Sequence, residues 1–168
     1  MKNITLIGMS GVGKSTVGKL LAMGTRQFHD TDTMLAKQLG YTHVDQVLEA
    51  FGPEWFLEME SYLICNHQWS DHFRFVIATG GSVIYKADAM EVLKRISTVV
   101  YLRIPHELLA KRVSFEGRGI VNKDNLTFSE LHAERHELYA KWADITVETR
   151  YSAPDAAARV IGKLGKGF

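Results

Sequence analysis

Short apolar runs alternate along the chain with longer segments in which apolar residues recur every three or four positions. The short runs are rich in β-branched residues and lack polar alternation, which is typical of strands buried on both faces of a parallel sheet. We expect strands at 3–8, 26–32, 73–78, 97–104 and 144–149. We expect helices at 14–24, 33–40, 44–50, 53–70, 87–96, 105–115, 127–143 and 153–164.

This alternation predicts an α/β fold: a three-layer αβα sandwich with a central parallel sheet of about five strands, in one domain over residues 1–168. Ligands of such sheets bind beyond the carboxyl ends of the strands. Three segments stand at those ends, and we expect them to converge in space: 8–15, 30–32 and 79–82.

The first of these segments, GMSGVGKS, matches G-x-x-x-x-G-K-[ST] and lies between a predicted strand and a predicted helix. In such a loop, backbone N–H groups and the helix N-terminus attract an anion. A parallel sheet with this loop after its first strand indicates a P-loop NTPase-like fold. The lysine reaches the β- and γ-phosphates, and the serine hydroxyl binds Mg²⁺. The phosphate-binding residues predicted on this basis are Gly11, Val12, Gly13, Lys14, Ser15 and Thr16. The alternative is a glycine-rich turn that matches by chance.

The second segment places two carboxylates, Asp30 and Asp32, two positions apart at a strand end. Asp30 is suited to orient Mg²⁺ through water, and Asp32 to accept a proton from an acceptor hydroxyl. The alternative is that Asp32 or Thr31 only caps the following helix.

The third segment carries Gly80 and Gly81, which allow a backbone to approach a ligand closely. The polar loop at 116–125 carries Arg118 between two glycines, as a lid that clamps phosphoryl oxygens would need. A plain turn and a solvated arginine are the alternatives for these two segments.

Composition narrows the class of protein. The net charge of +1 argues against nucleic acid and anionic membranes as partners, and no apolar run of about 18 residues is present to span a membrane. A single cysteine, Cys65, cannot form an internal disulfide, which fits the cytoplasm. Its helical register predicts a buried thiol. We expect a monomer.

Together these residues resemble shikimate kinases, from Ile4 to about Ile161, and ERHELYAKWADITVET (134–149) looks like that family's R-x-x-x-Y-x-x-x-A-D signature. The resemblance implies ATP as co-substrate, Mg²⁺ as cofactor and phosphorylation of a shikimate hydroxyl in aromatic amino acid biosynthesis. It implies catalytic roles for Lys14, Asp32 and Arg118. Acceptor binding would involve Asp32, Gly80, Gly81 and Arg135. Mg²⁺ would be held by Ser15 and Asp30, and Arg150 would lie beside the adenine. The lid would span about 114–125, and the acceptor-binding helices about 33–64.

The chain departs from the family pattern on the acceptor side. The family carries F-R-x-x-E, whose arginine pairs with the shikimate carboxylate, whereas this chain reads FLEME with Leu57 in that place. Ser82 stands where a third glycine is usual, and the lid reads RGIV instead of R-P-L-L. A hydrogen bond to a charged group is worth about 1.5–3 kcal/mol, so one lost arginine should weaken a carboxylate acceptor roughly ten- to a hundredfold. The alternative is that Leu57 packs in the core.

Three functions therefore remain in view: a shikimate kinase, a related kinase acting on a different small hydroxylated metabolite, and a nucleotide-binding regulator without transferase activity. The intact set of Lys14, Ser15, Asp30, Asp32 and Arg118 favours an enzyme.

Overall fold

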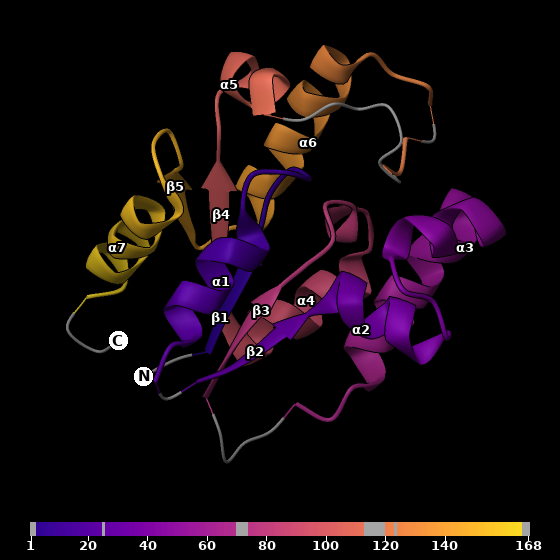
Figure 1. The fold of residues 1–168 in the computed structure, drawn as a ribbon, viewed down its shortest axis with the longest axis horizontal. Helices are drawn as coiled ribbons and strands as arrows, with labels where there is room; N and C mark the ends of the chain where they lie inside the picture. Colours follow the sequence, from indigo (N-terminus) through magenta and orange to yellow (C-terminus); the bar gives the residue numbers. More distant parts are fainter. Residues whose placement is uncertain (1–2, 25, 70–73, 113–119, 123, 166–168) are drawn as a thin grey trace.

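The structure is a computed structural model that describes residues 3–24, 26–69, 74–112, 120–122 and 124–165. Its centre is a five-stranded sheet in the order β2-β3-β1-β4-β5, with all four neighbouring pairs parallel (Figure 1). The strands are β1 (Asn3–Ile7), β2 (Arg26–Asp30), β3 (Arg74–Ala78), β4 (Ser97–Arg103) and β5 (Ile145–Glu148). The predicted fold class and strand number are confirmed.

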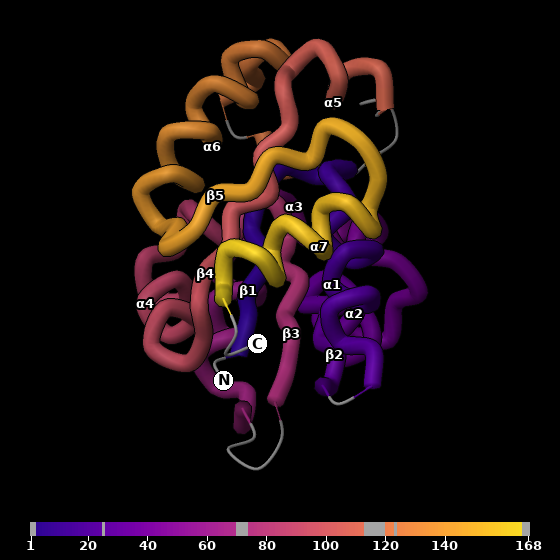
Figure 2. Tube along the Cα trace, turned by 90° about the vertical axis from the view of Figure 1, so that its left-hand side faces the viewer, coloured from indigo at the N-terminus to yellow at the C-terminus, as the bar shows by residue number. Residues whose placement is uncertain are grey.

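Helices cover both faces of the sheet. Figure 2 shows α1 on one side of strands β4, β1 and β3, with α4 and α6 on the other. The helices are α1 (Lys14–Ala22), α2 (Thr31–Gln38), α3 (Val44–Asn66), α4 (Ala87–Ile96), α5 (His106–Arg112), α6 (Phe128–Trp142) and α7 (Ala153–Leu164), with a short 3₁₀ turn η1 (Val83–Tyr85). No helix in the described part of the chain is long and apolar enough to cross a membrane.

The α3 segment contains the two predicted helices, which meet without a loop at Gly52, where the backbone is non-helical (φ 79°, ψ 169°) and the axis kinks ahead of Pro53. It ends at Asn66 rather than at 70, and the Trp69 side chain folds back to donate a hydrogen bond to the carbonyl of Ile64. Cys65, predicted to be buried, is exposed because it falls on the solvent face of this helix.

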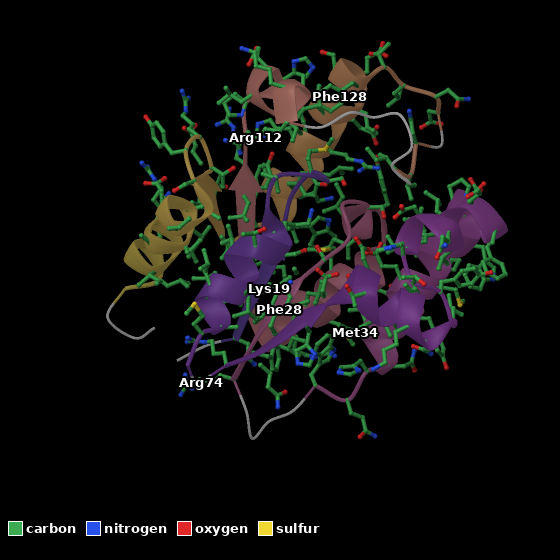
Figure 3. The ribbon with its side chains drawn as sticks, viewed as in Figure 1. Lys19, Phe28, Met34, Arg74, Arg112 and Phe128 are labelled. Carbon is green, nitrogen blue, oxygen red and sulfur yellow. The ribbon has the colours of Figure 1, made fainter. Side chains whose placement is uncertain are left out.

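Close packing of α1 on β2 fixes the position of this helix against the sheet. A Cβ atom on Gly18 would lie 2.5 Å from the Phe28 ring, so only glycine lets the helix sit this close. Lys19 extends beside the same ring, with its ammonium 6.0 Å from the ring centre (Figure 3). The N-terminus of α1 is thereby held at the carboxyl edge of the sheet.

Strand register brings the predicted functional segments together. Asp30 of β2 pairs with Ala78 of β3, and Ala78 in turn pairs with Leu6 of β1. The segments that follow these three residues therefore begin at one level of the sheet, as the sequence predicts.

Candidate active site

The loop after β1 forms a cradle that closes with the first turn of α1. Gly11 and Gly13 adopt positive φ angles of 81° and 103°, which L side chains rarely adopt. The ammonium of Lys14 is buried and donates hydrogen bonds to the carbonyls of Gly8 (2.7 Å) and Met9 (2.9 Å). Burial lowers the pKa of Lys14 to about 8, although the carboxylates of Asp32 and Asp30 oppose this shift. These two carbonyls therefore hold the Lys14 side chain inside the loop.

Asp30 joins the end of β2 to both neighbouring helices. Its Oδ2 accepts a hydrogen bond from the Ser15 hydroxyl (2.6 Å), and its Oδ1 accepts one from the backbone N–H of Thr33 (3.1 Å). Asp30, rather than Asp32 or Thr31, is therefore the N-cap of α2. A serine hydroxyl beside a carboxylate is an oxygen pair that suits Mg²⁺, which prefers oxygen ligands and few protein groups.

Asp32 lies in the first turn of α2, free of the capping role. Burial raises the pKa of Asp32 to about 6, and the nearby Lys14 ammonium opposes that rise. The adjacent Thr31 hydroxyl accepts a hydrogen bond from the N–H of Gly80 (3.1 Å), which ties the start of α2 to the glycine turn after β3.

Arg135 on α6 reaches the same turn from the opposite side. Its side chain is 1% exposed, stacks over the Tyr85 ring at 5.3 Å, and donates from Nε to the Tyr85 hydroxyl (3.1 Å). A second guanidinium nitrogen donates to the carbonyl of Val121. The Tyr139 hydroxyl, one turn further along α6, donates to the carbonyl of Gly81 (2.5 Å). The guanidinium is held in one orientation.

Two cavities meet at Asp32. The first, of about 280 Å³, is here called the acceptor cavity; its polar lining residues are Ser10, Asp32, Asp45, Ser82 and Arg135, and Val44, Phe56, Ile120 and Val121 form an apolar wall. The second, of about 370 Å³, is here called the phosphate cavity; it is lined by Gly11, Gly13, Lys14, Ser15, Thr16 and Arg112. Both cavities are also lined by Ser10, Asp32 and Gly81. The arrangement gives a glycine-rich cradle, a partly buried carboxylate and a fixed cation in one continuous site.

Comparison with known proteins decides the family. The shikimate kinase family model matches residues 10–164. The chain belongs to the shikimate kinase family. A shikimate kinase of Persephonella marina is 33% identical over 168 residues, covering 98% of this chain and 99% of that protein. One from Clostridium botulinum is 33% identical over 157 residues, covering 90% of each.

Solved structures of this family agree. A shikimate kinase from Acinetobacter baumannii, in complex with shikimate, aligns with a TM-score of 0.83 at 31% identity, covering 98% of this chain and 93% of that one. The enzyme from Aquifex aeolicus aligns with a TM-score of 0.82 at 28% identity, covering 98% and 97%. The likeness extends over the acceptor side as well as the P-loop.

Leu57, the departure from the family's F-R-x-x-E, is only 2% exposed and packs in an apolar cluster with Leu35, Val47 and Val121. Phe56, not Leu57, lines the acceptor cavity. Phe56 and Val121 belong both to this cluster and to the apolar wall of the cavity. That Leu57 occupies the place of the family's arginine stays a prediction from the sequence.

Two residues at the site belong to no motif in the sequence. Arg112, at the end of α5 (Figure 3), lines the phosphate cavity, and its guanidinium donates hydrogen bonds to the carbonyls of Thr149, Arg150 and Tyr151. It follows Lys111 in the basic last turn of α5, which did not distinguish it. Tyr85 is the other, an aromatic residue in the short turn η1. Glu60, by contrast, is the last residue of FLEME, the segment that resembles F-R-x-x-E, so the sequence does mark it.

Other predicted residues have different outcomes. Arg118 lies outside the described residues. Arg150 is exposed and pairs with Glu148 (2.7 Å), and its adenine role stays a prediction. Val12 places its side chain in the core, and its N–H donates to the carbonyl of Met9 (3.2 Å) within the loop itself. Thr16 lines the phosphate cavity, as expected.

Proposed function

We propose that the protein transfers the γ-phosphoryl group of ATP to a hydroxyl of shikimate, with Mg²⁺ as cofactor, to form shikimate 3-phosphate. The observation that carries this proposal is the position of Asp32, which lines both the acceptor cavity and the phosphate cavity. A base at that junction can take the proton of a hydroxyl in one cavity as the oxygen attacks a phosphorus atom in the other.

The proposed division of labour follows the two cavities. The loop N–H groups, the Lys14 ammonium and the Thr16 region hold the phosphates, and the anionic phosphate tail favours the charged form of a lysine whose pKa burial lowers. Arg135 pairs with the acceptor carboxylate, and the backbone of Gly80 and Gly81 orients the acceptor ring. The fixed positions supply most of the catalysis, since phosphoryl transfer depends mainly on alignment and charge neutralisation.

Mg²⁺ would be held by Ser15 and, through water, by Asp30, whose side chains already lie 2.6 Å apart. When bound, the ion neutralises charge on the phosphate oxygens. We propose Arg118 as the residue of a lid at about 114–125 that closes over the phosphates. We also propose that the chain acts as a cytoplasmic monomer that binds neither nucleic acid nor membrane, in keeping with its net charge of +1.

The test is ADP release coupled to a reporter reaction, with shikimate, ATP and Mg²⁺, and with EDTA and the Lys14→Met variant as controls. We expect turnover that depends on shikimate, ATP and Mg²⁺ together. Mass spectrometry should identify the product as shikimate 3-phosphate. No turnover above the ATPase background at millimolar shikimate would overturn the proposed acceptor.

A second candidate is a kinase for a less anionic hydroxylated metabolite. The acceptor cavity carries two carboxylates, Asp32 and Asp45, against one described cation, Arg135, and its wall is apolar. In such a lining, Arg135 is the one described cation that can pair with the carboxylate of an acceptor. In the same assay, a panel of uncharged polyols and hydroxy acids separates the two: a kcat/KM for a neutral polyol above that for shikimate favours this candidate.

A further inference from the structure

A carboxyl group with no role in the mechanism above lies directly behind the acceptor cavity. Glu60, on α3, is 1% exposed, and its Oε2 accepts a hydrogen bond from the Ser82 hydroxyl (3.1 Å). Its Oε1 is buried and has no hydrogen-bond partner in the described part of the chain. A buried, unpartnered carboxylate oxygen is costly, so this oxygen requires either a proton of its own or a donor.

The carboxyl group of Asp32 lies close to this oxygen, on the other side of Gly80. A Cβ atom built on Gly80 would lie 2.7 Å from Oδ1 of Asp32 and closer still to Oε1 of Glu60, so these two oxygens are less than twice that distance, 5.4 Å, apart. Two carboxylates this close in a buried site do not both ionise readily. One of the two therefore retains a proton near neutral pH.

The surroundings assign the proton to Glu60. The titratable groups that face it are Asp32 from α2 and Lys14 from the start of α1, and the polar groups are the Ser82 hydroxyl and the N–H of Gly80. Burial and the charge of Asp32 raise the pKa of Glu60 to about 8, against the opposing effects of Ser82, Lys14 and Gly80. Glu60 is 1% exposed, whereas Asp32 is only partly buried and lines both cavities, so the negative charge is better solvated on Asp32 and the proton is better placed on Glu60.

The unusual residues of this chain agree with a neutral Glu60. Position 57 precedes Glu60 by one helical turn, so an arginine there could pair with it and hold it ionised. Leu57 cannot do so. Ser82, in place of the usual glycine, supplies instead an uncharged hydroxyl donor to the same carboxyl group.

We propose that Glu60 is a positioning residue that keeps its proton and donates it in a hydrogen bond from Oε1 to the carboxylate of Asp32, while Ser82 holds its Oε2. No proton leaves Glu60 in the reaction; the proton of the acceptor hydroxyl goes to Asp32, and the hydroxyl oxygen forms the new bond to phosphorus as the bond to ADP breaks. The inference rests on the proposed function, because it takes Asp32 as the base.

The kinetic test compares Glu60→Gln with Glu60→Ala over the pH range from about 6 to about 10. A glutamine keeps an N–H donor for Asp32 and an oxygen for Ser82 but cannot ionise. We expect Glu60→Ala to lose kcat by roughly ten- to a hundredfold with an unchanged KM for ATP, and Glu60→Gln to recover most of that loss. The wild type should lose kcat as Glu60 ionises near pH 8, and Glu60→Gln should lack that decline. Glu58→Gln, at an exposed position two residues away, is the matched control.

Two results would overturn the proposal: a Glu60→Gln variant as impaired as Glu60→Ala although folded by circular dichroism, or an alkaline decline with the same midpoint and size in the wild type and in Glu60→Gln. A second measurement is independent of turnover. In protein labelled with ¹³C at the glutamate carboxyl carbon, the signal absent from Glu60→Gln should titrate above neutral pH, and a signal already ionised at about pH 6 contradicts the proposal. Because this titration needs no acceptor, failure to phosphorylate shikimate would refute the proposed function without deciding the state of Glu60.

Discussion

Among single residues, Asp32 and Arg135 define the reaction site from opposite sides. Asp32 comes from the first turn of α2 and Arg135 from the middle of α6, and both line one cavity. A neighbouring residue supports each of them: Thr31 accepts a hydrogen bond from the glycine turn beside Asp32, and Tyr85 accepts one from Arg135. Their roles can be separated by substitutions that remove one atom or one charge.

We expect Asp32→Asn to lower kcat about a hundredfold or more, since an amide cannot accept the hydroxyl proton. Nucleotide affinity should stay close to that of the wild type, because the phosphates are held by the loop and by Lys14. Stopped assays for turnover and isothermal titration with ADP and Mg²⁺ measure the two quantities. Loss of nucleotide binding in this variant would contradict the role given to Asp32.

We expect Tyr85→Phe to raise the KM for the acceptor about two- to tenfold and to leave kcat and the KM for ATP nearly unchanged. The hydroxyl that accepts from Nε of Arg135 is lost, while the ring under the guanidinium remains. Tyr62→Phe, at an exposed position on α3, is the control. An unchanged acceptor KM would show that Tyr85 does not position Arg135.

Among the strands and helices, the carboxyl ends of β1, β2 and β3 explain why the P-loop, the Asp30–Asp32 pair and the glycine turn could be predicted to converge. Each segment follows directly after a strand, and the parallel register of the three strands places these segments at one level of the sheet. Arg112 and Tyr85 could not be predicted in the same way. They reach the site from α5 and η1, and how those elements pack over the sheet is decided by tertiary contacts rather than by local pattern.

The glycine turn after β3 gives an element-level prediction. A Cβ on Gly80 would clash with the carboxyl groups of both Glu60 and Asp32, so Gly80→Ala must displace them. We expect kcat to fall up to about a hundredfold, as misplaced catalytic groups do, with ADP affinity retained. Gly162→Ala is the matched control: nothing lies within 4 Å of a Cβ there, in the last turn of α7. It should keep full activity and stabilise the protein by up to about 1 kcal/mol. Equal activity of the two variants would contradict this packing.

For the protein as a whole, the sequence predicted the sheet, the P-loop and the family, because these depend on short-range patterns and on motifs in a fixed order. It did not predict which face of α3 packs inward. For Leu57 two placements stayed open, beside the acceptor or in the core; in the structure Leu57 packs in the buried apolar cluster, and Phe56 lines the cavity. Buried polar contacts such as Glu60–Ser82 depend on that packing too.

One consequence of the buried Glu60 concerns global stability. Its pKa is about 8 in the folded protein and near 4.5 when exposed, so the folded state binds this proton more tightly than the unfolded state does. Stability from this group is full below about pH 4.5 and is lost as the pH rises through about 8. Asp32 contributes in the same direction up to about pH 6, and Lys14 in the opposite direction above about pH 8.

Glu60→Gln removes only the first of these contributions. We therefore expect the free energy of unfolding of Glu60→Gln, relative to that of the wild type, to increase by a few kcal/mol between about pH 5 and about pH 9, because only the wild type loses this contribution to stability. Urea unfolding of both proteins at several pH values measures this difference, and Glu58→Gln should show no such trend because that carboxylate is exposed. A difference that does not change with pH would mean that Glu60 is ionised throughout, and that the buried site tolerates two negative charges through Lys14.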